Sequence, residues 1–305
     1  MKFVSMIKVV FLGVAILFSG AAVATAVEIE IIKDVQFYEA SGIPLKADVF
    51  VREGEGPFPI VVAVHGGGFV RGDKEDIARQ CRTIAEAGYV VFDANYRTLS
   101  MGVFFPAFIK DVHTAAKWIK KHAGEYRGDP ERLALMGFSA GAYISSLVAV
   151  TTHVKKLQHE KDGLADVSSE VQAVIPFYGH HDLAILDEVQ QQTARLIWGR
   201  KVDEKIARLA SPASYMEHAV PTLLFHNEID PLVPVEQSRS MYRHLKEAGV
   251  PVYYYEFPEK AHDLLPDDEK WALGVAAKFL DVYLKGKKDT EMPGAIPERE
   301  KLRDN

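Results

Sequence analysis

Hydrophobic and polar residues alternate with a period of two in the first part of the chain after residue 27. The stretches EIEIIKDVQFYEA (28–40) and IPLKADVFV (43–51) both show this alternation, and the turn residues Ser41 and Gly42 lie between them. A period of two is typical of strands that bury one face. We therefore expect an antiparallel strand pair at the edge of a sheet.

The rest of the chain alternates between short apolar runs and longer amphipathic patterns. Helices are expected over 106–123, 140–150, 235–249 and from Pro266 to Gly286, and a further one around Cys81. Strands are expected at PIVVAVHG, YVVFDANYR, RLALMGF, VQAVIPFYG, PTLLFHNE and VYYYEFP. The continuous apolar runs of the first two are typical of strands buried on both faces. Strands that alternate with helices predict the α/β class, with a mostly parallel central sheet flanked by helices.

The first helical pattern, PAFIKDVHTAAKWIKKHA, is followed by Gly128, Asp129 and Pro130. These three residue types favour turns. We expect a turn here that closes the helix before the strand RLALMGF begins.

Residues 1–26 have the layout of a secretory signal peptide, with Lys2 and Lys8 before an apolar run and small residues at its end. The run is just long enough that an uncleaved membrane anchor is the alternative. In either case we expect an exported protein, periplasmic or secreted, and membrane-anchored only if the segment is retained. One α/β domain is expected over 27–286, followed by a charged, mobile tail over 287–305.

Composition excludes several classes of function. Hydrophobic residues make up 48% of the 305 residues, so a large core can form. A net charge of -6 lacks the basic excess on which nucleic-acid binding depends. Cys81 is the only cysteine, which rules out an internal disulfide and a cysteine metal cluster.

A serine enclosed by two glycines follows the apolar run RLALMGF. The segment Gly137-Phe138-Ser139-Ala140-Gly141 lies where the expected strand turns into the expected helix. Such a turn forces its central residue into strained backbone angles, and glycine is needed on both sides because larger side chains would collide. The turn would present the Ser139 hydroxyl as a nucleophile and the Ala140 N–H as a donor to a developing anion. A simple helix cap is the alternative for Ser139.

Three successive glycines follow the expected strand PIVVAV and His65. Because glycine has no Cβ, the N–H groups of Gly67 and Gly68 can approach a ligand oxygen closely. Together with the Ala140 N–H they predict an oxyanion hole, although a plain glycine turn is the alternative. His65 precedes the loop and is expected to be a structural hydrogen-bonding residue.

A serine nucleophile requires a base, and the base requires a carboxylate that orients it. Asp230 follows the expected strand PTLLFHNE, and His262 follows the expected strand VYYYEFP. The chain order Ser139, Asp230, His262 is that of hydrolases with a nucleophile elbow. Glu228 is an alternative orienting acid that lies nearer the strand. A turn aspartate and a surface or capping histidine are the alternatives without chemistry.

Several motifs together resemble the α/β-hydrolase superfamily. The similarity is to its esterase/lipase branch, which includes hormone-sensitive-lipase-like carboxylesterases and bacterial acetylxylan and feruloyl esterases, and it runs from about Lys46 to the final helix. The motifs are VVAVHGGGFVRGDK, DANYRT, PAFIKDVHTAAKWIKKHA, DPERLALMGFSAGAYISSLVAV, SPASYM and LLFHNEIDPLVPVEQS. The resemblance implies the α/β-hydrolase fold, a triad of Ser139, Asp230 and His262, an oxyanion loop at Gly67 and Gly68, and neither a cofactor nor a metal.

The sequence departs from this family in ways that concern the substrate. The oxyanion loop ends in Phe69, where tryptophan is common, and Glu28 to Gly56 leaves little room for the helical N-terminal cap of hormone-sensitive-lipase-like members. We therefore expect no large cap domain and an open site. The residues Phe69, Tyr143 and Tyr178 and the segment 179–211 are expected to shape the pocket, with QQTARLIWG as a small helix that overhangs the strand ends.

The predicted function is hydrolysis of small or sugar-linked carboxylic esters by serine acyl transfer, with a small-molecule ester as the substrate. Two alternatives stay open. The triad does not separate esters from amides, so an amide hydrolase of the kynurenine-formamidase or peptidase type is the second hypothesis. A hydrolase fold kept as a binding protein is the third. His180, His181 and Asp182 do not predict a metal site, because three adjacent residues cannot all face one ion, and we expect a loop that borders the pocket.

Overall fold

The computed structural model describes residues 27–186, 191, 194–195, 197–199 and 203–294. The predicted signal peptide or anchor, residues 192, 193 and 196 of QQTARLIWG and the end of the predicted tail lie outside these residues. Across the described ranges, no helix has the length and apolar character needed to cross a membrane.

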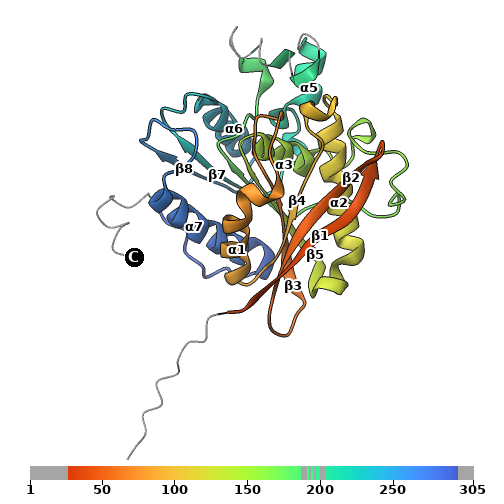
Figure 1. Ribbon diagram of the computed structural model, residues 1–305. Helices are drawn as coiled ribbons and strands as arrows, with labels where there is room; N and C mark the ends of the chain where they lie inside the picture. The colour runs from red at the N-terminus through yellow and green to blue at the C-terminus, as the bar shows by residue number, and fades with distance from the viewer. Residues whose placement is uncertain (1–26, 187–190, 192–193, 196, 200–202, 295–305) are drawn as a thin grey trace, which may run out of the picture.

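An eight-stranded sheet with the order β1-β2-β4-β3-β5-β6-β7-β8 forms the centre of the protein (Figure 1). The first two strands are antiparallel to their neighbours and the others are parallel. This confirms the expected edge pair and the mostly parallel sheet. The strands are β1 (Ile29–Ala40), β2 (Ile43–Arg52), β3 (Phe58–Val64), β4 (Val90–Ala94), β5 (Gly128–Phe138), β6 (Ala173–Phe177), β7 (Thr222–Asn227) and β8 (Val252–Phe257).

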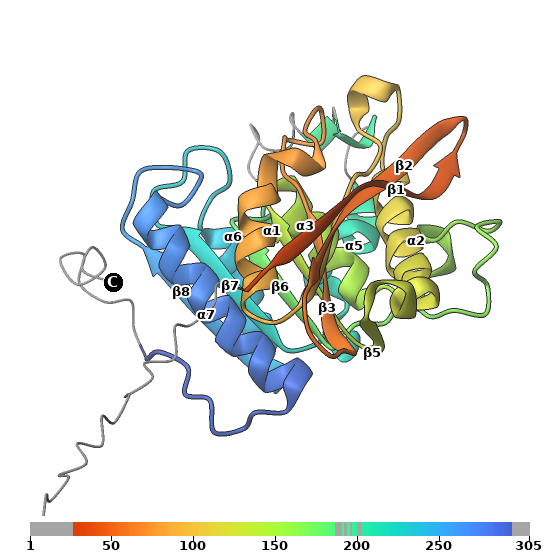
Figure 2. The same cartoon turned by 60° about the horizontal axis from the view of Figure 1, so that its bottom comes forward.

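Helices cover both faces of the sheet, as Figures 1 and 2 show. One face is covered by α1 (Ala78–Glu86) and α7 (Pro266–Lys285), and the other by α2 (Ala107–His122) and α3 (Ala140–Val150). A further helix, α6 (Glu236–Glu247), packs against β7 and β8. The short helix α5 (Glu204–Ala210) lies above the strand ends in Figure 1, in the segment between β6 and β7.

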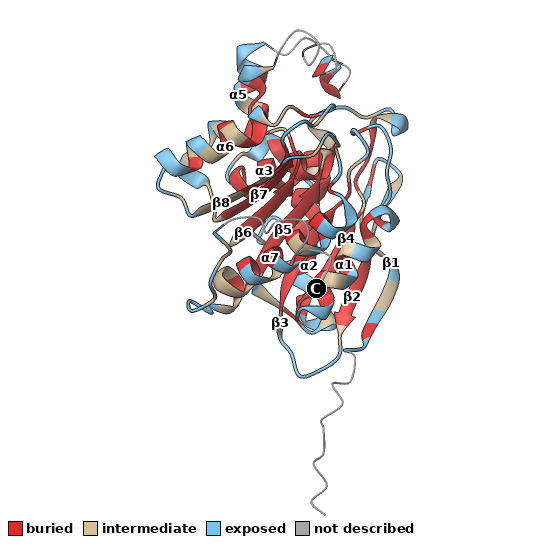
Figure 3. Ribbon diagram, turned by 90° about the vertical axis from the view of Figure 1, so that its left-hand side faces the viewer, coloured by how far each residue is buried: buried red, intermediate tan, exposed pale blue. Residues whose placement is uncertain are grey.

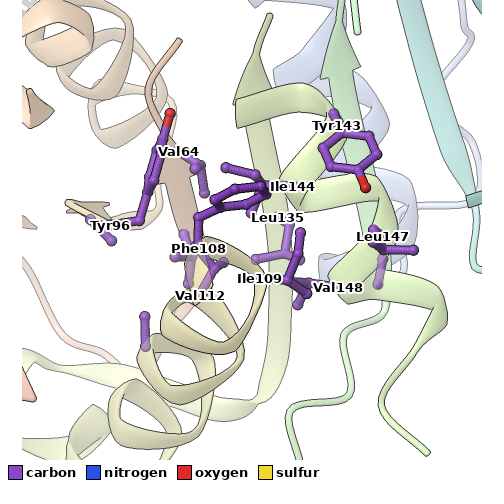
Figure 4. Close-up of a cluster of buried hydrophobic side chains, with 14 of the residues drawn as sticks. Val64, Tyr96, Phe108, Ile109, Val112, Leu135, Tyr143, Ile144, Leu147 and Val148 are labelled. Atoms are coloured by element: carbon purple, nitrogen blue, oxygen red, sulfur yellow. The ribbon is translucent and has the colours of Figure 1, made fainter. Parts of the chain in front are cut away.

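The hydrophobic core is divided into two layers by the sheet. Ile60, Val62 and Val64 of β3 pack with α2 and α3, whereas Val61 and Ala63 pack with α1 and α7. All five side chains are fully buried, and the strands form the buried centre of Figure 3. Figure 4 shows the side chains of α2 and α3 gathered over β3 and β5. The continuous apolar runs are therefore explained by burial on both faces.

The expected turn at Gly128, Asp129 and Pro130 is wrong. These residues form the start of β5, and Gly128 pairs with Phe58 across an irregularity in the register. The short 3-10 helix Ala123–Tyr126 ends the preceding helical segment instead. Pairing with β3 outweighs the turn preference of these residues, and the irregularity accommodates it.

The chain enters the sheet at the end of the strands opposite to Ser139. Phe50 of β2 pairs with Val91 near the start of β4, so Arg52 and its partner Ile29 lie where the parallel strands begin. Ser139 directly follows the end of β5. The first described residues and Ser139 therefore lie at opposite ends of the parallel strands. In Figure 1, β1 begins at the bottom of the sheet.

Candidate active site

Ser139 lies in the tight turn between β5 and α3, as the sequence predicted. Its backbone angles are φ 52° and ψ -115°, which a residue with a side chain rarely adopts. The strain shows that the surrounding packing holds the turn in place. Since α3 begins at Ala140, the Ala140 N–H is one of the helix donors that have no partner within the helix.

The two glycines around Ser139 are required by close packing. A Cβ on Gly137 would lie 2.2 Å from the carbonyl oxygen of Gly141. A Cβ on Gly141 would lie 2.1 Å from the carbonyl oxygen of Val64, at the end of β3. Larger residues at either position would push α3 away from the sheet, so the elbow depends on both glycines.

The glycine loop after β3 lies against this elbow. A Cβ on Gly66 would be 3.3 Å from the Ser139 Cβ, so the loop backbone is in contact with the serine. Gly67 and Gly68 have φ of 106° and 62°, and a Cβ on Gly67 would lie 1.9 Å from the Arg71 carbonyl oxygen. In the described loops, no backbone carbonyl accepts a hydrogen bond from the N–H groups of Gly67 and Gly68. These donors are available to a ligand oxygen.

His65 has a structural position, as expected. Its ring is fully buried and stacks on Tyr96, with 4.4 Å between the ring centroids. Its Nδ1 lies 2.8 Å from the Gly66 carbonyl oxygen. The Tyr96 hydroxyl donates to the carbonyl oxygens of His65 and Gly66. His65 and Tyr96 therefore hold the backbone of the glycine loop in place through hydrogen bonds to its carbonyl groups.

Ser139, His262 and Asp230 are joined by hydrogen bonds, although 123 residues of chain separate the serine from the histidine. The Ser139 Oγ lies 2.8 Å from His262 Nε2, and His262 Nδ1 lies 2.7 Å from Asp230 Oδ2. Glu228 is exposed at the surface, and Asp230 is the carboxylate that contacts His262. A hydroxyl, an imidazole and a carboxylate in series are the arrangement that activates a serine.

Comparisons with known proteins agree with this geometry. The sequence profile of BD-FAE matches residues 48–245, which include Ser139 and Asp230. The chain belongs to the BD-FAE family. This places it in the esterase/lipase group of the α/β-hydrolases and confirms the resemblance seen in the sequence.

Individual proteins similar to this BD-FAE member include the probable carboxylic ester hydrolase LipM of Mycobacterium tuberculosis. It is 33% identical over 69% of this chain and 51% of LipM, so the chain spans about half the length of this curated relative. Among solved structures, the propionate-bound Est2 esterase of Thermogutta terrifontis is similar with a TM-score of 0.69 and 22% identity, over 84% of this chain and 94% of Est2. A truncated carbohydrate esterase from gut microbiota has a TM-score of 0.71 and 20% identity, over 82% and 96%. The two structures support the α/β-hydrolase fold.

The Asp230 carboxylate of this BD-FAE member has four hydrogen-bond donors. Its Oδ2 accepts from His262 and, at 3.2 Å, shares the Nε2–H of His226 with the Val233 carbonyl oxygen. Its Oδ1 accepts from the N–H groups of Leu232 at 2.7 Å and Val233 at 2.9 Å. Burial by itself would raise the pKa of this carboxyl. The hydrogen bonds from the two imidazoles and the two amides outweigh burial and hold the pKa well below its usual range. Asp230 is therefore charged at neutral pH.

His226 is a site residue that the sequence reasoning missed. It lies in β7 and its side chain is fully buried. The available signal was a polar residue inside the apolar run PTLLFHNE, four positions before Asp230. Periodicity alone does not show which group such a residue contacts.

A cavity of about 1280 Å³ opens above Ser139. Its wall includes Ser139 and His262, the predicted oxyanion-hole residues Gly67, Gly68 and Ala140, and the predicted pocket residues Phe69, Tyr143 and Tyr178. The Tyr178 ring packs edge-on against the His262 ring, with 4.9 Å between centroids. The described residues Ala194, Ile197 and Trp198 also line the cavity, so part of QQTARLIWG borders the site as the sequence predicted.

His180 and His181 form part of a loop after β6, as expected, and His180 lines the cavity. Burial lowers the pKa of His180 to about 4 and that of His181 to about 3, so both rings are neutral at pH 7. Asp182 caps the short helix Leu183–Ile185 through the Ala184 N–H. Over the part of the chain that the structure describes, no group of three metal-ligating side chains comes together.

Proposed function

We propose that this protein is a serine carboxylesterase that acts by acyl transfer. The observation that carries the proposal is the pair of hydrogen bonds from Ser139 Oγ to His262 Nε2 and from His262 Nδ1 to Asp230 Oδ2, at 2.8 and 2.7 Å. Ser139 and His262 lie in the wall of a large cavity, beside the N–H groups of Gly67 and Gly68, which have no backbone partner among the described residues. Family membership and the named esterases among its relatives support the same reaction.

In this mechanism His262 Nε2 removes the Ser139 proton while the hydroxyl oxygen attacks the ester carbonyl. The N–H groups of Gly67, Gly68 and Ala140 donate to the oxygen that becomes negative. The imidazolium then gives its proton to the leaving alcohol, and water releases the acid from the acyl-serine in the same way. Asp230 stabilises the imidazolium and fixes the tautomer of His262 throughout.

The cavity has an apolar part on the α2 and α3 face of the sheet. It is lined by aromatic rings that contact one another: Phe69 and Tyr143 lie edge to face with centroids 5.5 Å apart, and Tyr143 and Trp198 at 6.0 Å. Leu183 and Ile197 complete this wall. We assign the acyl group of the substrate to this part, because apolar walls favour a hydrocarbon chain or ring.

The other part of the cavity is polar and lies on the side of His262. It is lined by Arg71, Asp76, Arg79, Gln80 and Glu269. Glu269 of α7 forms an ion pair with Arg79 and accepts from Gln80 Nε2 at 2.7 Å. Since His262 must reach the leaving oxygen, the alcohol portion lies here. Charged and amide groups suit an alcohol with further hydroxyls, so we propose small or sugar-linked esters as the substrate class.

Replacement of the serine tests this proposal most directly. We expect Ser139→Ala to lower kcat on p-nitrophenyl acetate by several orders of magnitude, because the nucleophile is lost while the fold is not. Circular dichroism and thermal unfolding should match the wild type, and a fluorophosphonate probe should label the wild type only. Undiminished hydrolysis by Ser139→Ala would rule out the mechanism.

The substrate class is tested with matched esters. We expect acetylated and feruloylated sugars to be hydrolysed with a higher kcat/KM than simple alkyl esters of the same acids, because only the sugar reaches the polar part of the cavity. N-formylkynurenine and a chromogenic peptide amide serve as amide substrates. A higher kcat/KM on either amide would replace the ester proposal by the amide-hydrolase alternative.

A further inference from the structure

A second imidazole contacts the carboxylate of the proposed triad. His226 Nε2 lies 3.2 Å from Asp230 Oδ2, the same oxygen that contacts His262, and 2.9 Å from the Val233 carbonyl oxygen. On the other side of the ring, Nδ1 lies 2.7 Å from the Ser238 Oγ. The side chains of His226 and Asp230 are both fully buried.

These contacts define the tautomer of His226. Nε2 faces two oxygens that only accept, the carboxylate and the Val233 carbonyl, so Nε2 carries a hydrogen. The Ser238 hydroxyl then donates to Nδ1. Each polar atom of the buried ring has a partner, and the ring is held between strand β7 and helix α6.

His226 and the two amides that contact Asp230 belong to different parts of the chain. The amides of Leu232 and Val233 belong to the same loop as the carboxylate, so they fix its side chain relative to that loop only. The loop stands at the surface, with Ile229 52% and Leu232 68% exposed. His226 belongs to β7 and contacts the loop twice, at the carboxylate and at the Val233 carbonyl. It therefore ties the loop to the sheet that also carries Ser139.

We propose that His226 is a positioning residue, whose Nε2–H holds the Asp230 carboxylate in the place from which it orients His262. The inference rests on the proposed esterase function and adds a residue to it. His226 does not touch the reacting atoms, because Asp230 and His262 lie between its ring and Ser139. Its effect is on the geometry of the triad, where displacements of about 1 Å can lower a rate by about 10²-fold.

Two near-isosteric replacements separate positioning from packing. In His226→Gln the side-chain amide nitrogen can occupy the place of Nε2 and donate to Asp230, whereas in His226→Asn the shorter side chain reaches only the place of Nδ1. We expect His226→Gln to keep kcat on p-nitrophenyl acetate within about threefold of the wild type, and His226→Asn to lower kcat by about 10- to 100-fold. KM should change little in both, because the cavity wall is unaltered.

His113→Asn is the matched control. His113 is also fully buried, and its ring nitrogens contact the hydroxyls of Ser169 at 2.8 Å and Thr151 at 3.2 Å, remote from the triad. We expect this variant to lose thermal stability as His226→Asn does, with kcat within about twofold of the wild type. An equal loss of kcat in His113→Asn would show that destabilisation alone explains the effect and would overturn the inference.

Other outcomes also decide the question. Wild-type kcat in a folded His226→Asn variant, or equal losses in the Gln and Asn variants, would overturn it. If His226→Asn does not fold, Ser238→Ala replaces it, since this change frees the ring and leaves Asp230 intact. We then expect kcat to fall by about 3- to 10-fold with KM unchanged, and an unchanged kcat would overturn the inference. Absence of hydrolysis and of fluorophosphonate labelling in the wild type itself would instead contradict the proposed function.

Discussion

Asp230 and Asp93 are two buried aspartates whose pKa values are shifted in opposite directions. Asp230 follows β7 at the edge of the sheet and has four N–H donors around its carboxylate. Asp93 lies within β4, fully buried, and neither carboxylate oxygen is within hydrogen-bonding distance of an N–H or hydroxyl donor among the described residues. The polar groups that act on it are the buried Cys81 thiol, the Lys74 ammonium and the carboxylates of Asp48 and Asp73.

The difference shows that partners, more than depth, decide the charge of a buried carboxyl. Burial raises the pKa of Asp93 well above its usual range. The Cys81 thiol and the Lys74 ammonium offset this in part, and the carboxylates of Asp48 and Asp73 raise it further. The pKa of Asp93 is therefore raised, whereas that of Asp230 is lowered. The local set of donors favours the ionised form of Asp230, which is the form that the proposed triad requires.

Among the variants that test this comparison, we expect the largest loss of activity from Asp230→Asn. The amide would present an N–H to His262 Nδ1 and favour the wrong tautomer, so we expect kcat to fall by about 10⁴-fold. Stopped-flow or steady-state kinetics of p-nitrophenyl acetate hydrolysis measure the loss of kcat, and thermal unfolding checks that the variant is folded. Glu228→Gln is the control, with kcat within about twofold of the wild type. A loss below tenfold for Asp230→Asn would mean that the four donors do not mark a catalytic carboxylate.

A medium effect is expected from Asp48→Asn, next to Asp93 in the paired strands β2 and β4. Asp48 is buried and contacts Lys33 Nζ at 2.5 Å and the buried Lys74 Nζ at 3.3 Å. Burial would raise its pKa, but these lysines outweigh burial and lower it. We expect the free energy of unfolding at pH 7 to fall by about 2 kcal/mol, because Lys74 loses a buried partner.

The pH dependence follows from the lowered pKa of Asp48. A carboxyl whose folded pKa is below its unfolded value stabilises the protein above the unfolded pKa of about 4, and this contribution is lost as the pH falls. The difference between wild type and Asp48→Asn should therefore be largest at neutral pH and shrink in acid. Urea unfolding at several pH values measures it, and a difference that grows in acid would contradict the assignment.

The smallest effect, with the opposite sign, is expected from Asp93→Asn. Because the folded pKa of Asp93 is raised, ionisation of the unfolded chain opposes folding as the pH rises above about 4. An amide of the same shape does not ionise, so we expect Asp93→Asn to be more stable than the wild type by about 1 kcal/mol at pH 7, with the gain declining toward pH 4. A less stable Asn variant at pH 7 would show that Asp93 is charged and partnered in the folded protein.

The strands, the tight turn at Ser139 and the glycine loop beside it could be predicted from the sequence because local patterns determine them. Gly137 and Gly141 are needed where they stand by steric contact alone, and a strand buried on both faces has a continuous apolar run. The order of Ser139, Asp230 and His262 followed from parallel strands that end at one edge of the sheet. These features need little knowledge of distant contacts.

What the sequence did not predict depends on contacts between distant segments. The segment at Gly128 pairs with β3 despite its turn residues. The contacts of His226 come from a loop and a helix that lie beyond β7 in the chain. The sequence YVVFDANYR does not show that the Asp93 side chain is fully buried. The two parts of the cavity combine α1 and α7 with the segment between β6 and β7, which no periodicity brings together.

The chain enters the sheet at the edge where the parallel strands begin, opposite the edge that carries Ser139. If the protein is attached to a resin or a cell surface through a linker placed before Val27, the cavity therefore points away from that support. We expect bulky polymeric substrates to reach it in this orientation. Attachment beside the exposed Leu232, in the cavity wall, would obstruct that access. We therefore expect protein immobilised before Val27 to turn over large substrates faster than protein immobilised beside Leu232.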